Sequence, residues 1–235
     1  MNIDRIDFIS SYCDRWCARC GYTSRCSAFA ADAAVAMCGD DREGLELAFG
    51  RPHPEGNDAA RIPEWLLELE NTVMGATDEA EFRSVEDARD LRIRETTIAK
   101  VADAFTMAAH GWLVARAETL RGNADETVRE ALDIASHDAT FILVKLRRAL
   151  DGRDRHERGE DLDDHPVQND WNGSVKVALI SVERSASAWE VIAQATGDDT
   201  PLVLASQLRD LKREVESAFP RAWSFTRPGF DEPGR

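Results

Sequence analysis

Four cysteines share one short segment near the start of the chain, and they are the residues whose types and spacing point most directly to chemistry. They are Cys13, Cys17, Cys20 and Cys26, in the pattern C-x3-C-x2-C-x5-C. Thiolates separated by a few residues can converge on one metal centre without the backbone crossing itself. The segment is therefore predicted to be a metal-binding loop.

Two kinds of metal centre suit four thiolates. A structural zinc draws its sulphur atoms to roughly 3.8 Å apart, since each Zn–S bond is about 2.3 Å long, and commonly uses two separated cysteine pairs. This chain has one such pair, Cys17 and Cys20, with a single cysteine on either side. A cubane offers more widely spaced iron atoms, so one continuous loop can wrap it. The spacing favours a [4Fe-4S] cluster bound by Cys13, Cys17, Cys20 and Cys26, with zinc as the alternative.

The segment Cys17-x2-Cys20-x5-Cys26 resembles the cluster loops of helix-hairpin-helix DNA glycosylases and of WhiB-like regulators. Both of those loops end in CxxC followed by five residues and a cysteine, and the resemblance covers the ten residues from Cys17 to Cys26. It implies a [4Fe-4S] cluster with Cys17, Cys20 and Cys26 as three of its ligands. Cys13 is then the candidate for the fourth.

The same region also contains three arginines and a fifth cysteine. Arg15, Arg19 and Arg25 lie between the cysteines, where they could offset the thiolate charge or simply be solvated. Cys38 stands apart, just before Gly39, and is predicted to be a packed thiol rather than a ligand.

Two helices are expected to bracket the loop. Apolar residues at Ile3, Ile6, Phe8 and Ile9 suggest a short amphipathic helix before it, and a second helix is expected from Ala28 to Met37, with Ser27 as its N-cap.

A second candidate site involves histidine and aspartate. His137 and Asp138 are adjacent in a predicted helix, His110 lies on the preceding one, and Asp170 could be a last ligand. The set resembles the metal site of HD-type phosphohydrolases, and this alternative requires the four side chains to converge.

Composition limits the classes of partner. The 235 residues are 43% hydrophobic, which is enough for a substantial core, and 44 acidic against 29 basic residues give a formal charge of −15. Such a charge repels a phosphate backbone, so nucleic acid is a poor partner. No run of about 20 apolar residues could cross a bilayer, and Asp4, Arg5 and Asp7 interrupt any secretory signal. A cytoplasmic protein with reduced thiols is expected.

The remaining pattern predicts an all-α fold, an antiparallel helical bundle that follows the N-terminal cysteine-rich metal-binding loop. Apolar residues recur at helical spacings, which permits long helices within 79–120 and predicts another over 125–150. A further helix is expected to be capped by Asp170 or Asn172 and to end at Gly197, and the last is expected to begin at Pro201 and to end before Pro220. The segment 151–169 is highly charged and lacks aromatic residues, so a mobile loop is expected there. The aromatic tail 221–235 is expected to dock on the bundle.

These patterns divide the chain into a cysteine-rich segment 1–39, a loop-rich connection 40–62 with a short helix near Leu45 to Phe49, and a helical domain 63–235 that begins with a helix at Pro63. The function expected is that of an iron-sulphur protein whose cluster is structural or handles electrons. The bundle would bind a partner protein or small molecule that the sequence does not identify. A zinc-stabilised interaction module and the HD-type phosphohydrolase remain as alternatives.

Overall fold

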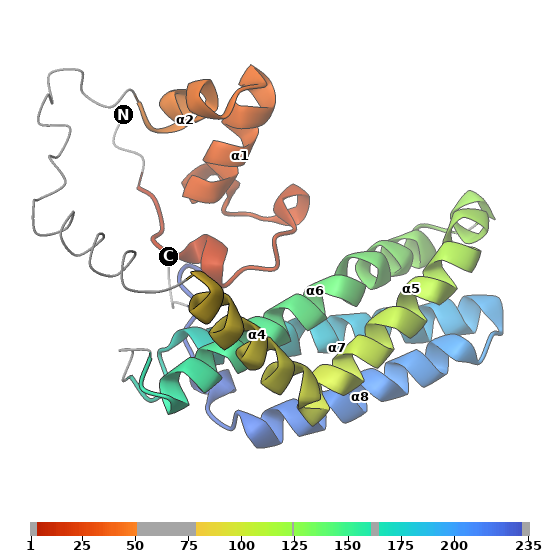
Figure 1. The fold of residues 1–235 in the computed structure, drawn as a ribbon. Coiled ribbons are helices and arrows are strands. Elements are labelled where there is room, and N and C mark those ends of the chain that lie inside the picture. The colour runs from red at the N-terminus through yellow and green to blue at the C-terminus, as the bar shows by residue number, and fades with distance from the viewer. Residues whose placement is uncertain (1–3, 51–78, 124, 161–164, 232–235) are drawn as a thin grey trace, which may run out of the picture. The chain divides into compact units, whose positions relative to one another are not determined.

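The computed structural model describes residues 4–50, 79–123, 125–160 and 165–231. These residues form seven α-helices and no strand (Figure 1). The predicted all-α class is confirmed. No described helix is both long enough and apolar enough to cross a membrane.

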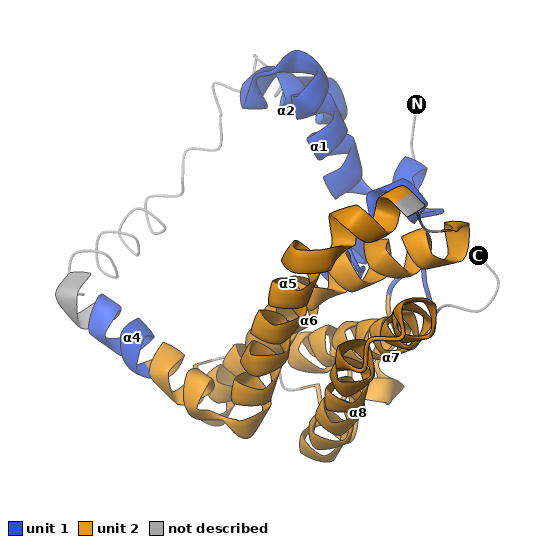
Figure 2. Cartoon of the chain, turned by 90° about the vertical axis from the view of Figure 1, so that its right-hand side faces the viewer, with its two compact units in different colours: residues 1–88, 228–235 blue, residues 89–227 orange. Residues whose placement is uncertain are grey.

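The chain divides into two compact units (Figure 2). The smaller comprises Met1–Ala88 together with Pro228–Arg235, and the larger comprises Arg89–Arg227. The division falls inside helix α4 (Glu79–Glu95). The predicted boundary between residues 62 and 63, and the helix predicted to begin at Pro63, lie outside the described residues.

The larger unit is a four-helix bundle. Its helices are α5 (Thr97–Asn123), α6 (Glu126–Glu157), α7 (Asp170–Thr196) and α8 (Thr200–Ala218). Each packs on the next along the chain, and α5 also packs on α8, which closes the ring. The connections between α5 and α6 and between α7 and α8 are short, so these neighbours run antiparallel (Figure 1). The predicted bundle is confirmed.

Local signals set the helix ends. The Asp125 carboxylate accepts a hydrogen bond of 3.0 Å from the Val128 amide and caps α6. The Asn169 side chain caps α7 in the same way, through the amide of Asn172. Gly197, with a φ of 65°, ends α7 in the left-handed region that favours glycine. These short polar side chains satisfy amides that have no partner inside the helix.

Aromatic side chains fill the bundle core. Phe105, Trp189 and Phe225 are among the largest fully buried side chains. The rings of Trp112 and Trp189 meet edge to face, with centroids 5.3 Å apart and planes at 82°. This geometry suits the quadrupoles of the two indoles and links α5 to α7.

The charged segment that was predicted to be a loop begins as helix. Helix α6 continues to Glu157, so the predicted loop start at Asp151 is wrong. The reason lies in α4: Arg92 donates two hydrogen bonds to Asp154, at 2.7 and 3.2 Å. Arg89, only 3% exposed, lies 3.8 Å from the carboxylates of Asp151 and Asp154 and forms an ion pair with Glu160. These arginines add to the ion pairs that Asp151 and Asp154 make within α6, with Arg155 and Arg158.

The smaller unit contains a helical hairpin of α1 (Ser27–Cys38) and α2 (Asp41–Phe49). The two helices approach closely at Gly44, where a Cβ atom would lie 2.5 Å from the Cα of Val35. Both helices were expected, although each is longer than predicted.

The predicted helix through Ile3 and Ile9 does not form among the described residues. A single 3-10 turn, Ile9–Ser11, occurs instead. The preceding backbone bonds to the cysteine loop rather than to itself, since the Ile6 amide donates to the Arg25 carbonyl at 3.1 Å. Arg25 in turn donates to the Asp4 carboxylate at 2.7 Å.

The aromatic tail divides between the two units. Ala222 and Phe225 are buried in the larger unit, and Lys176 donates to the Phe225 carbonyl at 2.6 Å. Residues from Pro228 onward belong to the smaller unit. The expected docking on the bundle is confirmed for the first part of the tail, through Phe225.

Candidate metal centre

Short turns carry the four cysteines. Cys17 begins the 3-10 turn Cys17–Arg19 and Cys20 ends it, with the Cys20 amide bonded to the Cys17 carbonyl at 3.2 Å. A second such turn, Thr23–Arg25, ends at Cys26. Cys26 is also the N-cap of α1, a role the sequence had suggested for Ser27. The tight turns keep the thiols close together along the chain.

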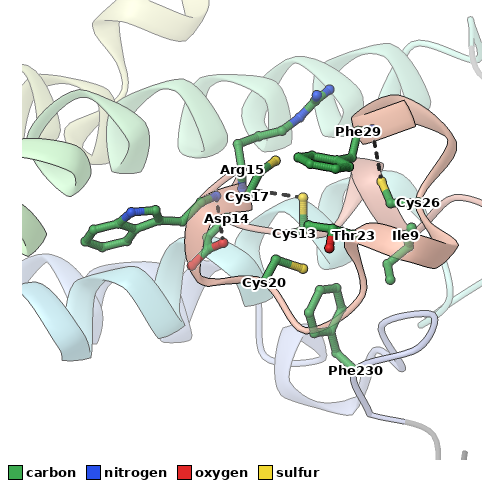
Figure 3. Close-up of a pocket in the computed structure, with 11 residues that line it drawn as sticks. Ile9, Cys13, Asp14, Arg15, Cys17, Cys20, Thr23, Cys26, Phe29 and Phe230 are labelled. Carbon is green, nitrogen blue, oxygen red and sulfur yellow. Dashed lines mark hydrogen bonds between the residues drawn. The ribbon is translucent and has the colours of Figure 1, made fainter. Parts of the chain in front are cut away.

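All four thiols line one pocket. It is a small pocket of about 20 Å3 that is partly open to solvent. Cys26 is buried, and the other three are half-buried. Figure 3 shows the sulphur atoms of Cys13, Cys17 and Cys20 facing a common space, with the Phe29 and Phe230 rings on two sides of the group. The pocket is a concave site with a thiol donor set and apolar walls.

Backbone amides point at three of the sulphur atoms. The Arg15 amide donates to the Cys13 sulphur at 3.4 Å, and the Tyr22 amide donates to the Cys20 sulphur at 3.4 Å. The Phe29 amide donates to the Cys26 sulphur at 3.5 Å. Because Cys26 caps α1, its sulphur also lies at the positive end of the helix dipole. Such donors favour the thiolate form that binds metals, and they tune the potential of iron-sulphur clusters.

The pKa of Cys17 shows that the thiols influence one another. Burial raises this pKa above its ordinary value of 9.0, and negative charge on Cys13, Cys26 and Cys20 raises it further. Arg15 acts in the opposite direction, with a smaller effect. Four thiolates in one pocket therefore repel each other, and a bound cation would relieve that repulsion.

The three arginines of the loop have different surroundings. Arg15 lines the pocket and lies 4.0 Å from Asp32. The guanidinium of Arg19 stacks over the Trp16 ring, 4.0 Å from its centroid. Arg25 ties the loop to Asp4 through side-chain and backbone acceptors. Only Arg15, of these three, is placed to offset thiolate charge.

Two observations define the limits of the site. Cys38, at the end of α1, is half-buried and is not among the residues that line the pocket. Within the described part of the chain, no three histidine, cysteine, aspartate or glutamate side chains are arranged to hold a single metal ion.

The histidine–aspartate set is engaged in other contacts. Asp138 is fully buried and accepts two hydrogen bonds from Arg184, at 2.6 and 3.0 Å. Asp170 accepts two from Arg148, at 2.6 and 2.9 Å.

The two histidines of that set lie in different environments. The His137 ring stacks on Phe141, and His110 is exposed on α5. The carboxylates of Asp138 and Asp170 are thus both paired with arginines. The structure does not bring these two aspartates and the two histidines into one metal site.

Sequence reasoning missed two aromatic walls of the pocket. Phe29 lies just after Cys26, so the local pattern could have suggested it. Phe230 lies at the other end of the chain, and its only signal was the aromatic character of the tail.

Comparison with known proteins adds no relative: no family model, curated protein or solved structure matches this chain.

Proposed function

We propose that the smaller unit binds a metal centre through the thiolates of Cys13, Cys17, Cys20 and Cys26, and that this centre is a [4Fe-4S] cluster. The observation that carries the proposal is the shared pocket of the four thiols, lined by apolar walls and supplied with three backbone amides that donate to sulphur. With four thiolates available, every iron has a protein ligand. The cluster would therefore supply structural cross-linking or electron handling rather than substrate activation.

The hydrophobic cluster around the cysteines also favours a bound metal. Among the residues that the structure describes, its buried members are Ile6, Ile9 and Cys26, with a few partly buried neighbours. A cluster of this size contributes little folding free energy, and small domains commonly add a metal for that purpose. A cytoplasmic location, which keeps thiols reduced, is part of the proposal.

The bundle is proposed to supply recognition of a partner protein or small molecule. It offers a cavity of about 330 Å3 lined by Asp90, Ile93, Arg94, Arg147, Arg148 and Asp151. Both charge signs are present there, so a polar ligand suits it better than an apolar one.

Zinc is the second candidate. The observation that favours it is the turn at Cys17 and Cys20, a C-x2-C pair whose second sulphur accepts from the Tyr22 amide. A zinc centre would make the smaller unit an interaction module stabilised by metal.

Anaerobic purification followed by iron, sulphide and zinc analysis, with a visible spectrum, separates these outcomes. Iron and sulphide in equal amounts support the cluster, whereas one zinc without sulphide rejects it in favour of the second candidate. Cys17→Ser should lose the metal in either case. Cys38→Ser is the matched control, since it removes a thiol of the same unit outside the pocket, and it should keep full metal content. Equal metal in the two variants would reject the ligand assignment.

A further inference from the structure

The C-terminal segment from Pro228 contributes to the cysteine pocket, although it follows the whole bundle in sequence. Phe230 packs against the buried cluster of Ile6, Ile9 and Cys26. Its ring also meets the Tyr22 ring edge to face, with centroids 5.1 Å apart and planes at 73°. Phe230 is one of the residues that line the pocket itself (Figure 3). One wall of the pocket thus comes from the far end of the chain.

The residue before it fits this position tightly. Gly229 has a φ of 76°, which disfavours other residues, and a Cβ atom there would lie 2.9 Å from Cδ1 of Ile6 and 3.1 Å from Cδ1 of Ile9. The backbone of the tail therefore lies directly against the apolar side chains beneath the cysteine loop. A contact this close specifies where the Phe230 ring is held.

We propose that Phe230 is a shielding residue of the metal centre, whose ring keeps water and competing ligands away from the thiolates. This inference rests on the proposed metal-binding function. The apolar shell around a metal site controls solvent access and the local dielectric, and it affects how firmly the metal is held. Phe29 forms a second wall from α1, so removal of Phe230 opens the pocket on one side (Figure 3).

The same contact couples the metal to the tail. If the docked tail raises the affinity of the site for metal, then by thermodynamic linkage the bound metal must stabilise the docked tail by the same free energy. Residues 229–231 should therefore exchange their amide hydrogens faster after the metal is removed.

The test compares Phe230→Ala, Phe230→Leu and Phe8→Ala in the full chain purified without oxygen. Phe8→Ala is the matched control, because Phe8 belongs to the same unit but is 74% exposed. All three variants should start with the metal content of the wild type. On addition of a chelator, Phe230→Ala should lose metal about tenfold faster, as expected for the loss of a supporting group around a metal. Phe230→Leu should restore most of the protection, and Phe8→Ala should behave as the wild type.

A second pair of variants checks the same contact through the backbone. Gly229→Ala should speed metal loss because its Cβ meets Ile6, whereas Gly39→Ala, at a φ of 71° with open space around it, should not. Equal rates of loss in the wild type, Phe230→Ala and Gly229→Ala would overturn the shielding role and leave metal binding intact. A wild-type protein that neither carries nor takes up iron or zinc would instead overturn the proposed function, and the shielding role with it.

Discussion

Asp138 of α6 and Arg184 of α7 form a bidentate ion pair between these two helices, with N–O distances of 2.6 and 3.0 Å. The aspartate side chain is fully buried, and that of Arg184 is 26% exposed. A buried carboxylate needs such a partner, since its desolvation costs several kcal/mol. The pair therefore specifies how α6 and α7 align.

Removal of Arg184 should destabilise the bundle strongly. Arg184→Leu leaves Asp138 buried without this partner, and we expect a loss of roughly 3 to 5 kcal/mol in the free energy of unfolding. Urea denaturation measures it. Arg148→Leu is the matched control, because Arg148 makes the same bidentate contact with Asp170 at a more exposed position. The side chain of Arg148 is 45% exposed and that of Asp170 is 34% exposed. Its expected cost is about 0 to 1 kcal/mol, and a similar cost for both variants would contradict the assigned role.

Asp198 should make bundle stability depend on pH in the acid range. Its carboxylate accepts a hydrogen bond of 2.9 Å from the Trp112 indole. This bond, and to a smaller extent the hydrogen bond from the Thr200 amide, lowers the pKa of Asp198 to about 2. An unfolded aspartate titrates near pH 3.9. Because the folded pKa is the lower one, the stabilisation is present above about pH 4 and is lost as the pH falls towards about 2.

The comparison of wild type with Asp198→Asn tests this effect. The difference between their free energies of unfolding should be constant near neutral pH and should shrink between about pH 4 and 2. In a Trp112→Phe background, which keeps a ring but removes the indole donor, the shrinkage should be smaller. A difference that does not vary with pH would show that the charge of Asp198 contributes nothing.

Arg89 should hold the charged end of α6. It lies near the carboxylates of Asp151 and Asp154 and is 3% exposed. Arg89→Leu removes a buried cation from beside these two carboxylates, so the end of α6 should open more often. Amide exchange across residues 151–157 should therefore accelerate while the middle of α6 stays protected. Arg94→Leu serves as the control, since Arg94 pairs with Asp90 at the surface. Accelerated exchange in both variants would point to a general effect on α4 instead.

The close approach of α1 and α2 predicts opposite effects for two glycines in helices. Gly44→Ala places a Cβ 2.5 Å from the Cα of Val35, so the hairpin should loosen by about 1 to 3 kcal/mol. Gly111→Ala in α5 meets open space and should stabilise its helix by about 0.5 to 1 kcal/mol. Hydrogen exchange of residues 27–49 reports the first change, and thermal unfolding of the bundle reports the second. Stabilisation by Gly44→Ala would contradict the described packing.

Local patterns were enough to predict the helices of the bundle. Helix periodicity and capping act over a few residues, so Asp125 and Gly197 could be recognised as helix ends from the sequence. The grouping of Cys13, Cys17, Cys20 and Cys26 was predictable for the same reason, because short spacers leave the thiols little room to separate. That these thiols bind a metal, and which metal they bind, stays a prediction.

Contacts between distant residues could not be predicted in this way. The sequence by itself determined an all-α bundle and one cluster of thiols, since both depend on neighbours along the chain. Only the tertiary structure decided that α6 extends through its charged end, because Arg92 lies 62 residues away from Asp154. Tertiary structure also decided that Phe230 reaches the cysteine pocket and that Asp138 faces Arg184 rather than a metal. In each case, the local structure is stabilised by a side chain that is distant in sequence and that only folding brings into contact.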